Sequence, residues 1–208
     1  MSPRIIEKTV YTFDELSAEA KERARSWWRE GCMDHDWYEC IYEDAETVAN
    51  ILGITFDQKA VPRMDGKFNT HPKIFFSQGD GACFEGTYRY ALGWKKALLA
   101  HAPKDETLLK IGEDLQSAQA SALYQCVART KQRGHYNHSG CMVVDVERSD
   151  GHDVTQEREE EITQALRDFA DWIYDSLRKE YEYQMSDECV DENIKCNEYN
   201  FDVSGRIV

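Results

Sequence analysis

The chain has 208 residues, with 39 acidic against 25 basic side chains and a formal net charge of −14. A chain of this length fits one domain and needs no disulfide or metal for stability. Its aromatic content of 12% is too high for an acidic disordered chain. No apolar run approaches the roughly 20 residues of a membrane span, and no signal peptide opens the sequence. We therefore expect one globular domain, residues 1–208, in the cytoplasm and without membrane contact.

The charge is distributed unevenly along the chain. Residues 1–53 carry 12 acids and 6 bases, residues 54–135 carry 8 and 12, and residues 136–208 carry 19 and 7. The net charges are therefore −6, +4 and −12. Direct nucleic-acid binding is disfavoured because both partners are negative. The seven cysteines form no C-x-x-C pair, which favours reduced thiols over a disulfide framework.

The first quarter of the chain predicts a strand followed by a helix. Weak alternation over residues 4–11 favours the strand. Thr12 and Glu15 have the spacing of a capping box, and Ser17 is a second candidate cap. The helix is expected to stop at Gly31.

A second helix is predicted over residues 36–52, and it forms a helical hairpin with the first. A short strand follows over residues 54–56. Residues 61–72 contain two prolines and a glycine, which predicts a loop. A β-hairpin is expected next, with strands at 73–77 and 82–88 around a turn at 78–81.

The remaining elements are predicted to be mainly helical. Helices are expected over residues 91–101 and 105–132, and a strand over 135–147. A long helix begins at Thr155, and an acidic segment then precedes a last strand at 199–203. The fold class is α+β, with several helices, including the helical hairpin and the long helix, packed on a small, mainly antiparallel sheet.

Two motifs carry the residue types of metal ligands. His135, His138 and Cys141 form H-x-x-H-x-x-C, whose side chains are typical zinc ligands. On a strand this spacing sends them to alternating faces, so only a loop brings them together. Asp145 and Glu147 share one face of a strand, as carboxylates that hold Mg²⁺ do. The alternative interpretation of both motifs is a polar turn that leads into an exposed strand end.

The block at residues 77–82, Ser-Gln-Gly-Asp-Gly-Ala, has the composition of a tight turn. Such turns often present recognition residues, which makes Gln78 and Asp80 candidate contacts with a partner. Cys83 follows the turn, but a nucleophilic cysteine needs a histidine nearby in space. Paired aromatics, Trp27 with Trp28 and Trp172 with Tyr174, are more typical of a core or of partner anchors.

The acidic last third contains the main candidate binding surface. Ordered carboxylates on a helix face can imitate a row of phosphates and compete for basic channels. A solvated helix face is the alternative. The candidate contact residues on the long helix are Glu157, Glu160, Glu161, Asp168, Asp171 and Asp175.

The block Ser-Gln-Gly-Asp-Gly-Ala-x-Phe at residues 77–84 resembles a family of small phage and prophage proteins. The segments at residues 7–17, 145–148 and 181–188 are similar to that family as well. The resemblance implies an origin on a mobile element and, through labels that some members carry, an antitoxin-like role. It implies no catalytic residue.

The leading hypothesis is a phage-encoded acidic protein that binds a host protein or ribonucleoprotein defence complex in the bacterial cytoplasm, as anti-CRISPR proteins do. It predicts no cofactor and no catalytic residue, and it leaves a homodimer open. A metal-dependent enzyme acting on nucleic acid or nucleotides is the first alternative, with His135, His138, Cys141, Asp145, Glu147 and Asp80 as its candidate residues. An antitoxin is the second.

Overall fold

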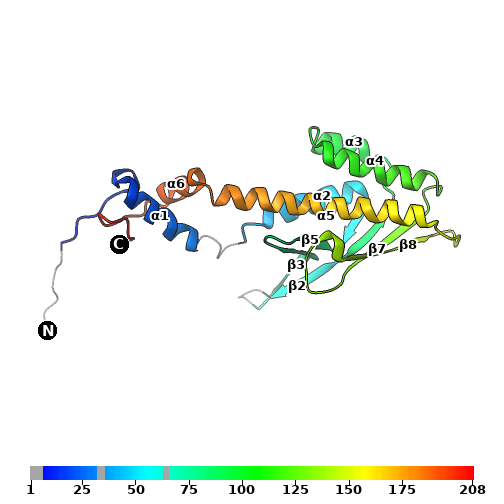
Figure 1. Cartoon of the computed structure of the whole chain (residues 1–208), viewed down its shortest axis with the longest axis horizontal. Coiled ribbons are helices and arrows are strands. Elements are labelled where there is room, and N and C mark those ends of the chain that lie inside the picture. Colours follow the sequence, from blue (N-terminus) through cyan, green and yellow to red (C-terminus); the bar gives the residue numbers. More distant parts are fainter. Residues whose placement is uncertain (1–6, 32–35, 63–65) are drawn as a thin grey trace. The chain divides into compact units, whose positions relative to one another are not determined.

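A computed structural model describes residues 7–31, 36–62 and 66–208 (Figure 1). The chain forms two compact units. The terminal unit consists of residues 1–37 and 179–208, and the central unit consists of residues 38–178. Helices and small antiparallel sheets together confirm the α+β class. The single domain over residues 1–208 stays a prediction, since this division does not show that either unit folds alone.

Short helical elements form much of the described part of the terminal unit. They are η1 (Phe13–Glu15), α1 (Ala18–Gly31) and α6 (Asp187–Cys196). Thr12 donates its backbone N–H to the Glu15 carboxylate over 2.8 Å, so the predicted capping contact forms, although it closes a 3₁₀ turn. Ser17 caps α1, because its Oγ accepts from the Ala20 N–H at 3.2 Å.

An apolar cluster joins the two ends of the chain within this unit. Phe13 of η1 packs edge-on against Phe201, with ring centroids 6.4 Å apart. Trp27 meets Tyr199 at 5.1 Å and lies half-buried on the cluster. The tryptophan pair Trp27–Trp28 is therefore part of the packing. The buried members of the cluster are Phe13, Leu16, Ala20, Ala24, Val190, Ile194 and Phe201.

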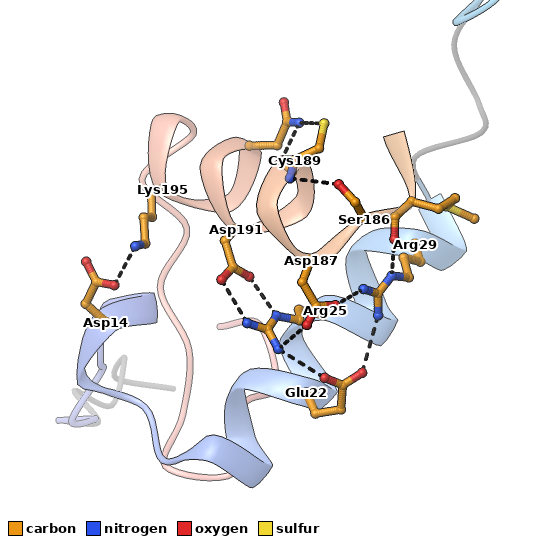
Figure 2. A network of polar contacts seen from close by, with 11 residues as sticks. Asp14, Glu22, Arg25, Arg29, Ser186, Asp187, Cys189, Asp191 and Lys195 are labelled. Carbon is orange, nitrogen blue, oxygen red and sulfur yellow. Dashed lines mark hydrogen bonds and ion pairs between the residues drawn. The ribbon is translucent and has the colours of Figure 1, made fainter. Parts of the chain in front are cut away.

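Ion pairs connect α1 to α6 (Figure 2). Arg25 donates to both oxygens of Asp191, at 2.7 and 2.8 Å. It also pairs with Asp187 at 3.0 Å, and Arg29 pairs with the same carboxylate. The acidic segment predicted over residues 187–197 is thus largely a helix, and part of its charge is neutralised by α1.

The central unit contains a four-stranded antiparallel sheet in the order β1-β6-β7-β8. Its strands are β1 (Ile54–Phe56), β6 (Gly86–Arg89), β7 (Cys126–Gln132) and β8 (Met142–Arg148). Two separate hairpins accompany this sheet. The first joins β2 (Gln58–Pro62) to β3 (Phe68–Pro72), and the second joins β4 (Ile74–Ser77) to β5 (Gly81–Phe84).

Helices cover one side of these strands (Figure 1). They are α2 (Glu39–Leu52), α3 (Trp94–His101), α4 (Glu106–Ala120) and α5 (Gln156–Gln184). An aromatic group fixes α5 on the strands, because Phe169 contacts Phe56 of β1 at 6.3 Å and Phe84 of β5 at 5.8 Å. All three rings are buried. In the described part of the chain, no helix is long and apolar enough to cross a membrane.

Two predicted elements are wrong in the central unit. The loop predicted over residues 61–72 contains strand residues of the β2–β3 hairpin, where Pro62 and Pro72 end their strands. A two-stranded hairpin has two free edges, which tolerate proline. The helix predicted over residues 105–132 stops at Ala120. Leu123 and Tyr124 then adopt φ of 54° and 60°, a conformation that no right-handed helix contains.

Other boundaries shift as well, and the strand predicted over residues 135–147 begins only at Met142, after a loop and a 3₁₀ turn. The predicted strand 82–88 divides at Glu85, because β5 pairs with β4 while β6 pairs with β1 and β7. At the chain ends, Tyr11 and Phe201 form a single bridge in place of the strands 4–11 and 199–203, and residues 4–6 lie outside the described residues. The helical hairpin also stays a prediction, because residues 32–35 between its helices are outside that range.

Candidate functional site: a loop junction on helix α5

Three segments of the central unit meet at one place, which we call the loop junction. It consists of the turn at residues 77–81, the loop at residues 133–141 and the middle of α5. Gly79 donates its N–H to the Tyr174 hydroxyl on α5 at 3.1 Å. Asn137 donates its N–H to Asp80 at 2.8 Å, and its side chain donates to the Phe76 carbonyl at 3.3 Å. The Gln-Gly-Asp-Gly turn is therefore held by both other segments.

Gly81 makes the close approach of the two loops possible. A Cβ at this position would lie 2.6 Å from the Cβ of His138 and 2.8 Å from its Cα. Real Cβ atoms are not found so close to another carbon. The second glycine of the turn is thus required by the packing of His138 and not only by the geometry of a β-turn.

Cys141 and His138 face each other across a single 3₁₀ turn. Their atoms Sγ and Nε2 lie 3.4 Å apart, within hydrogen-bond range for sulfur. The turn spans Ser139–Cys141, and the Cys141 N–H donates to the His138 carbonyl at 2.8 Å. Residues three apart eclipse in a 3₁₀ turn, which puts both side chains on one side. Gly140 supports this arrangement, since a Cβ there would lie 3.0 Å from two atoms of the imidazole.

Asp171 of α5 adds a carboxylate to the junction. Burial raises the pKa of Asp171 above its usual value, and the charges of Asp168 and Asp175 act in the same direction. A hydrogen bond with Ser139 and the proximity of His138 oppose this rise. The residue keeps solvent contact. The carboxylate therefore belongs both to the loop junction and to the outer face of α5.

Cys83 lies behind the turn and is a poor nucleophile. Its side chain is buried, and burial raises the pKa of the Cys83 thiol to about 12, with the nearby Cys141, Glu85 and Asp80 adding to the rise. The thiol is therefore protonated at neutral pH. The requirement for a neighbouring histidine is met at Cys141 instead.

The predicted metal residues are only partly brought together. His138 and Cys141 are in contact, while His135, Asp145 and Glu147 are exposed. Across residues 7–31, 36–62 and 66–208, no three His, Cys, Asp or Glu side chains gather so that they could hold a metal ion.

The six acids predicted as contacts form a row on the outer face of α5, which we call the acidic row. Successive members are separated by one, three, four or seven residues, so a period of 3.6 keeps them on one face. The buried face of the same helix contains Ile162, Leu166, Phe169 and Ile173. At 1.5 Å per residue, the row extends over about 27 Å. Its members are Glu157, Glu160, Glu161, Asp168, Asp171 and Asp175.

Two members of the acidic row are paired with cations of the same helix. Arg158 binds Glu161 at 2.6 Å and Arg178 binds Asp175 at 3.1 Å. The other four have no Lys or Arg partner at ion-pair distance in the described parts of the chain. Of the two turn residues predicted as contacts, Gln78 is exposed, whereas Asp80 is half-buried and accepts the bond from Asn137.

Sequence reasoning missed Ser139 and Tyr174, which connect the loops to α5. In the sequence, Tyr174 stands out only as a member of an aromatic pair, and no sequence pattern marks Ser139. Cys141 and His138 belong to the H-x-x-H-x-x-C motif, whose residue types favour a metal site. The sequence gives no sign of the 3₁₀ turn that brings these two side chains together.

The part of the chain that contains the loop junction matches a known protein family. Residues 37–187 match the family described as a domain of unknown function (DUF8835). This range includes the turn, the loop and the acidic row. No curated protein and no solved structure matches the chain. Since the match covers well over half of its length, the chain belongs to the DUF8835 family.

Proposed function

We propose that this protein is a non-enzymatic binding protein that docks the acidic row of α5 on a basic surface of a nucleic-acid-handling complex. The observation that carries the proposal is the row itself, six acidic residues on one face of α5, of which four are exposed and two, Glu161 and Asp168, are half-buried. A duplex presents its phosphates as a similar series of negative charges, and proteins bind them with Lys and Arg side chains. A basic channel would therefore accept either partner.

Charge on the row is available to a partner. Glu157 and Glu160 are exposed, and Gln156 donates to Glu160 without neutralising it. Gln164 likewise donates to Asp168 at 2.8 Å. These neutral donors hold the carboxylates in place while the negative charge is retained. Ordered charges lose less conformational entropy on binding than free side chains do.

The partner that we propose is a host protein or ribonucleoprotein defence complex, so that the protein acts as an anti-CRISPR-like inhibitor encoded by a phage or prophage. This part depends on the resemblance of the block at residues 77–84 to phage proteins. In this proposal the protein acts in the cytoplasm of the bacterial host. Gln78, an exposed residue of the turn, is the neutral contact in this proposal.

The test combines capture of the partner with charge reversal. The full-length tagged protein is used to isolate its partner from host lysate, and the affinity is then measured at several salt concentrations. Replacing Glu160, Glu161, Asp168 and Asp171 by Lys should weaken binding at least tenfold and flatten its salt dependence. A matched control reverses the exposed acids Glu30, Glu43, Asp153 and Glu192, which leaves the row intact at the same net charge.

Two results would overturn the proposal. One is equal affinity of the row variant and the control variant for the captured complex. The other is the absence of any nucleic-acid-handling partner together with no protection of phage in an interference assay.

A further inference from the structure

We propose that Cys141 is a nucleophilic modification site, with His138 as its base, that reacts with small neutral hydroperoxides. The site shares Asp171 with the acidic row but would exist whatever partner the row binds. His138 and Cys141 belong to the motif that predicts a metal site, but here they act as base and nucleophile.

The geometry of the pair supports this chemistry. An imidazole nitrogen 3.4 Å from a thiol sulfur can accept the thiol proton. Gly81 and Gly140 both pack so close to His138 that a Cβ at either position would lie 3.0 Å or less from it, and this close packing limits the space around the imidazole. A base held in one position loses little freedom when it receives the proton.

Arg167 of α5 contributes a second, independent observation. Its Nη2 donates to the carbonyl of Met142, the residue after Cys141, at 3.2 Å. Its Nε is buried and has no hydrogen-bond partner among the residues that the structure describes. The guanidinium is thus bound to the backbone one residue from Cys141, and its buried Nε keeps an unused donor.

Accessibility limits which reagents can react. Cys141 and His138 are both half-buried, so a small molecule reaches the sulfur more easily than a polypeptide does. Asp171 of α5 is close enough to His138 for the two to interact, and its negative charge disfavours anionic reagents. Hydrogen peroxide is both small and neutral.

The reaction balances without any further reactant. His138 takes the Cys141 proton, and the thiolate attacks one peroxide oxygen, so that an S–O bond forms and the O–O bond breaks. The second oxygen leaves as hydroxide and receives the proton from the imidazolium to form water. Sulfur loses two electrons to the peroxide and becomes a sulfenic acid.

Alkylation of the full chain measures the nucleophile. The reduced protein is treated at pH 7 with less than one equivalent of iodoacetamide, and labelling of each cysteine is quantified by peptide mass spectrometry. Cys196 is the internal control, because it is an exposed thiol. We expect Cys141 to react at least tenfold faster than Cys196 in the same molecule, although it is the less exposed of the two. A ratio of one or less overturns the proposal without any variant.

Variants then test the base. His138→Gln should reduce the ratio to about one or below, whereas His135→Gln, an exposed histidine of the same loop, should leave it unchanged. The buried thiols Cys83 and Cys126 report on folding, since they stay unlabelled only while the central unit is intact. An unchanged ratio in a folded His138→Gln variant shows that the imidazole is not the base and overturns the proposal.

Hydrogen peroxide with dimedone as a trap tests the reagent class. We expect a dimedone adduct on Cys141 in the wild-type protein and none on Cys196. Rapid alkylation of Cys141 without this adduct would reject the hydroperoxide as the reactant.

Discussion

Arg25 and Asp191, which lie 166 positions apart in the sequence, form a bidentate ion pair between α1 and α6, with N–O distances of 2.7 and 2.8 Å (Figure 2). Both side chains are mostly removed from solvent, at 19% and 25% exposure. Paired hydrogen bonds between charged groups are stronger than the usual exposed ion pair. The pair therefore holds the two chain ends of the terminal unit together.

Removing the charge of Asp191 should destabilise the protein. Asp191→Asn is expected to lower the free energy of unfolding by about 1–3 kcal/mol, since Arg25 keeps Asp187 and Glu22 as weaker partners. Urea unfolding followed by circular dichroism measures the effect. The control Glu19→Gln breaks the exposed pair with Arg23 and should change stability by less than about 0.5 kcal/mol. Equal losses in both variants would contradict the assignment.

The same pair predicts a pH dependence. Arg25 lowers the pKa of Asp191 below its ordinary value. A carboxyl with a lowered pKa in the folded state contributes stability above its unfolded pKa, about 3.9, and loses it as the pH falls through the folded value. The difference between wild type and Asp191→Asn should be complete at pH 7 and shrink below about pH 4. A difference that is constant down to pH 2 would be inconsistent with this linkage.

Gly81 should tolerate no side chain. Gly81→Ala places a Cβ against His138 and is expected to destabilise the central unit by about 1–3 kcal/mol. Gly79→Ala is the control, because Gly79 has a φ of +82° but no atom within 4 Å of the added Cβ. It should lose only the backbone strain, about 1–2 kcal/mol. Thermal unfolding measures both stabilities. In a separate labelling of the folded proteins with iodoacetamide, Gly81→Ala should slow the reaction of Cys141, and Gly79→Ala should not.

Gln119 satisfies the backbone of Cys126 in the core. Its side-chain amide donates to the Cys126 carbonyl at 2.7 Å, and its oxygen accepts from the Cys126 N–H at 3.1 Å. Gln119→Leu leaves both groups buried and unpaired, which should reduce stability by about 2–4 kcal/mol. Ser117→Ala, on the exposed face of α4, should change stability by less than about 0.5 kcal/mol. Chemical denaturation distinguishes the two, and a neutral Gln119→Leu would refute the role of this contact.

Asp171 should be mildly unfavourable for folding at neutral pH. Its pKa is raised in the folded state, so folding binds a proton more tightly and stability falls as the pH rises from the unfolded pKa to the folded one. Asp171→Asn should therefore stabilise the protein slightly at pH 7, by about 0.5 kcal/mol or less because the residue is solvent-exposed. The gain should vanish near pH 3. Thermal melts at the two pH values provide the measurement, and a destabilised variant at pH 7 would contradict the prediction.

Local signals predicted most helices correctly because their caps are local. Ser17 before α1 and Gly53 after α2 are both observed as caps, and the acids of α5 follow a single helical period. Strand pairing is harder to predict from the local sequence. The residues of β7 fit a helix as well as a strand, and the choice is made by hydrogen bonds from β6 and β8, which come from distant parts of the chain.

The acidic last third shows the same limit at the level of charge. A count of 19 acids in residues 136–208 suggested one surface. In the structure, Asp187 and Asp191 pair with α1, while Glu157, Glu160, Asp171 and Asp175 of α5 are exposed. The net charge follows from the sequence alone. Whether a given carboxylate is available to a partner depends on which Lys and Arg side chains the fold brings near it.

The sequence by itself determined the α+β class, most helix positions and the common face of the acidic row, because these depend on composition and on a period within one helix. Only the tertiary structure decided that the turn at residues 77–81 meets the loop of His138 and Cys141 on α5. That meeting depends on contacts such as Asn137 with Asp80 and Gly79 with Tyr174, between residues 57 and 95 positions apart. Local sequence preferences do not determine contacts between residues so far apart in the chain, because such contacts result from the packing of the whole central unit.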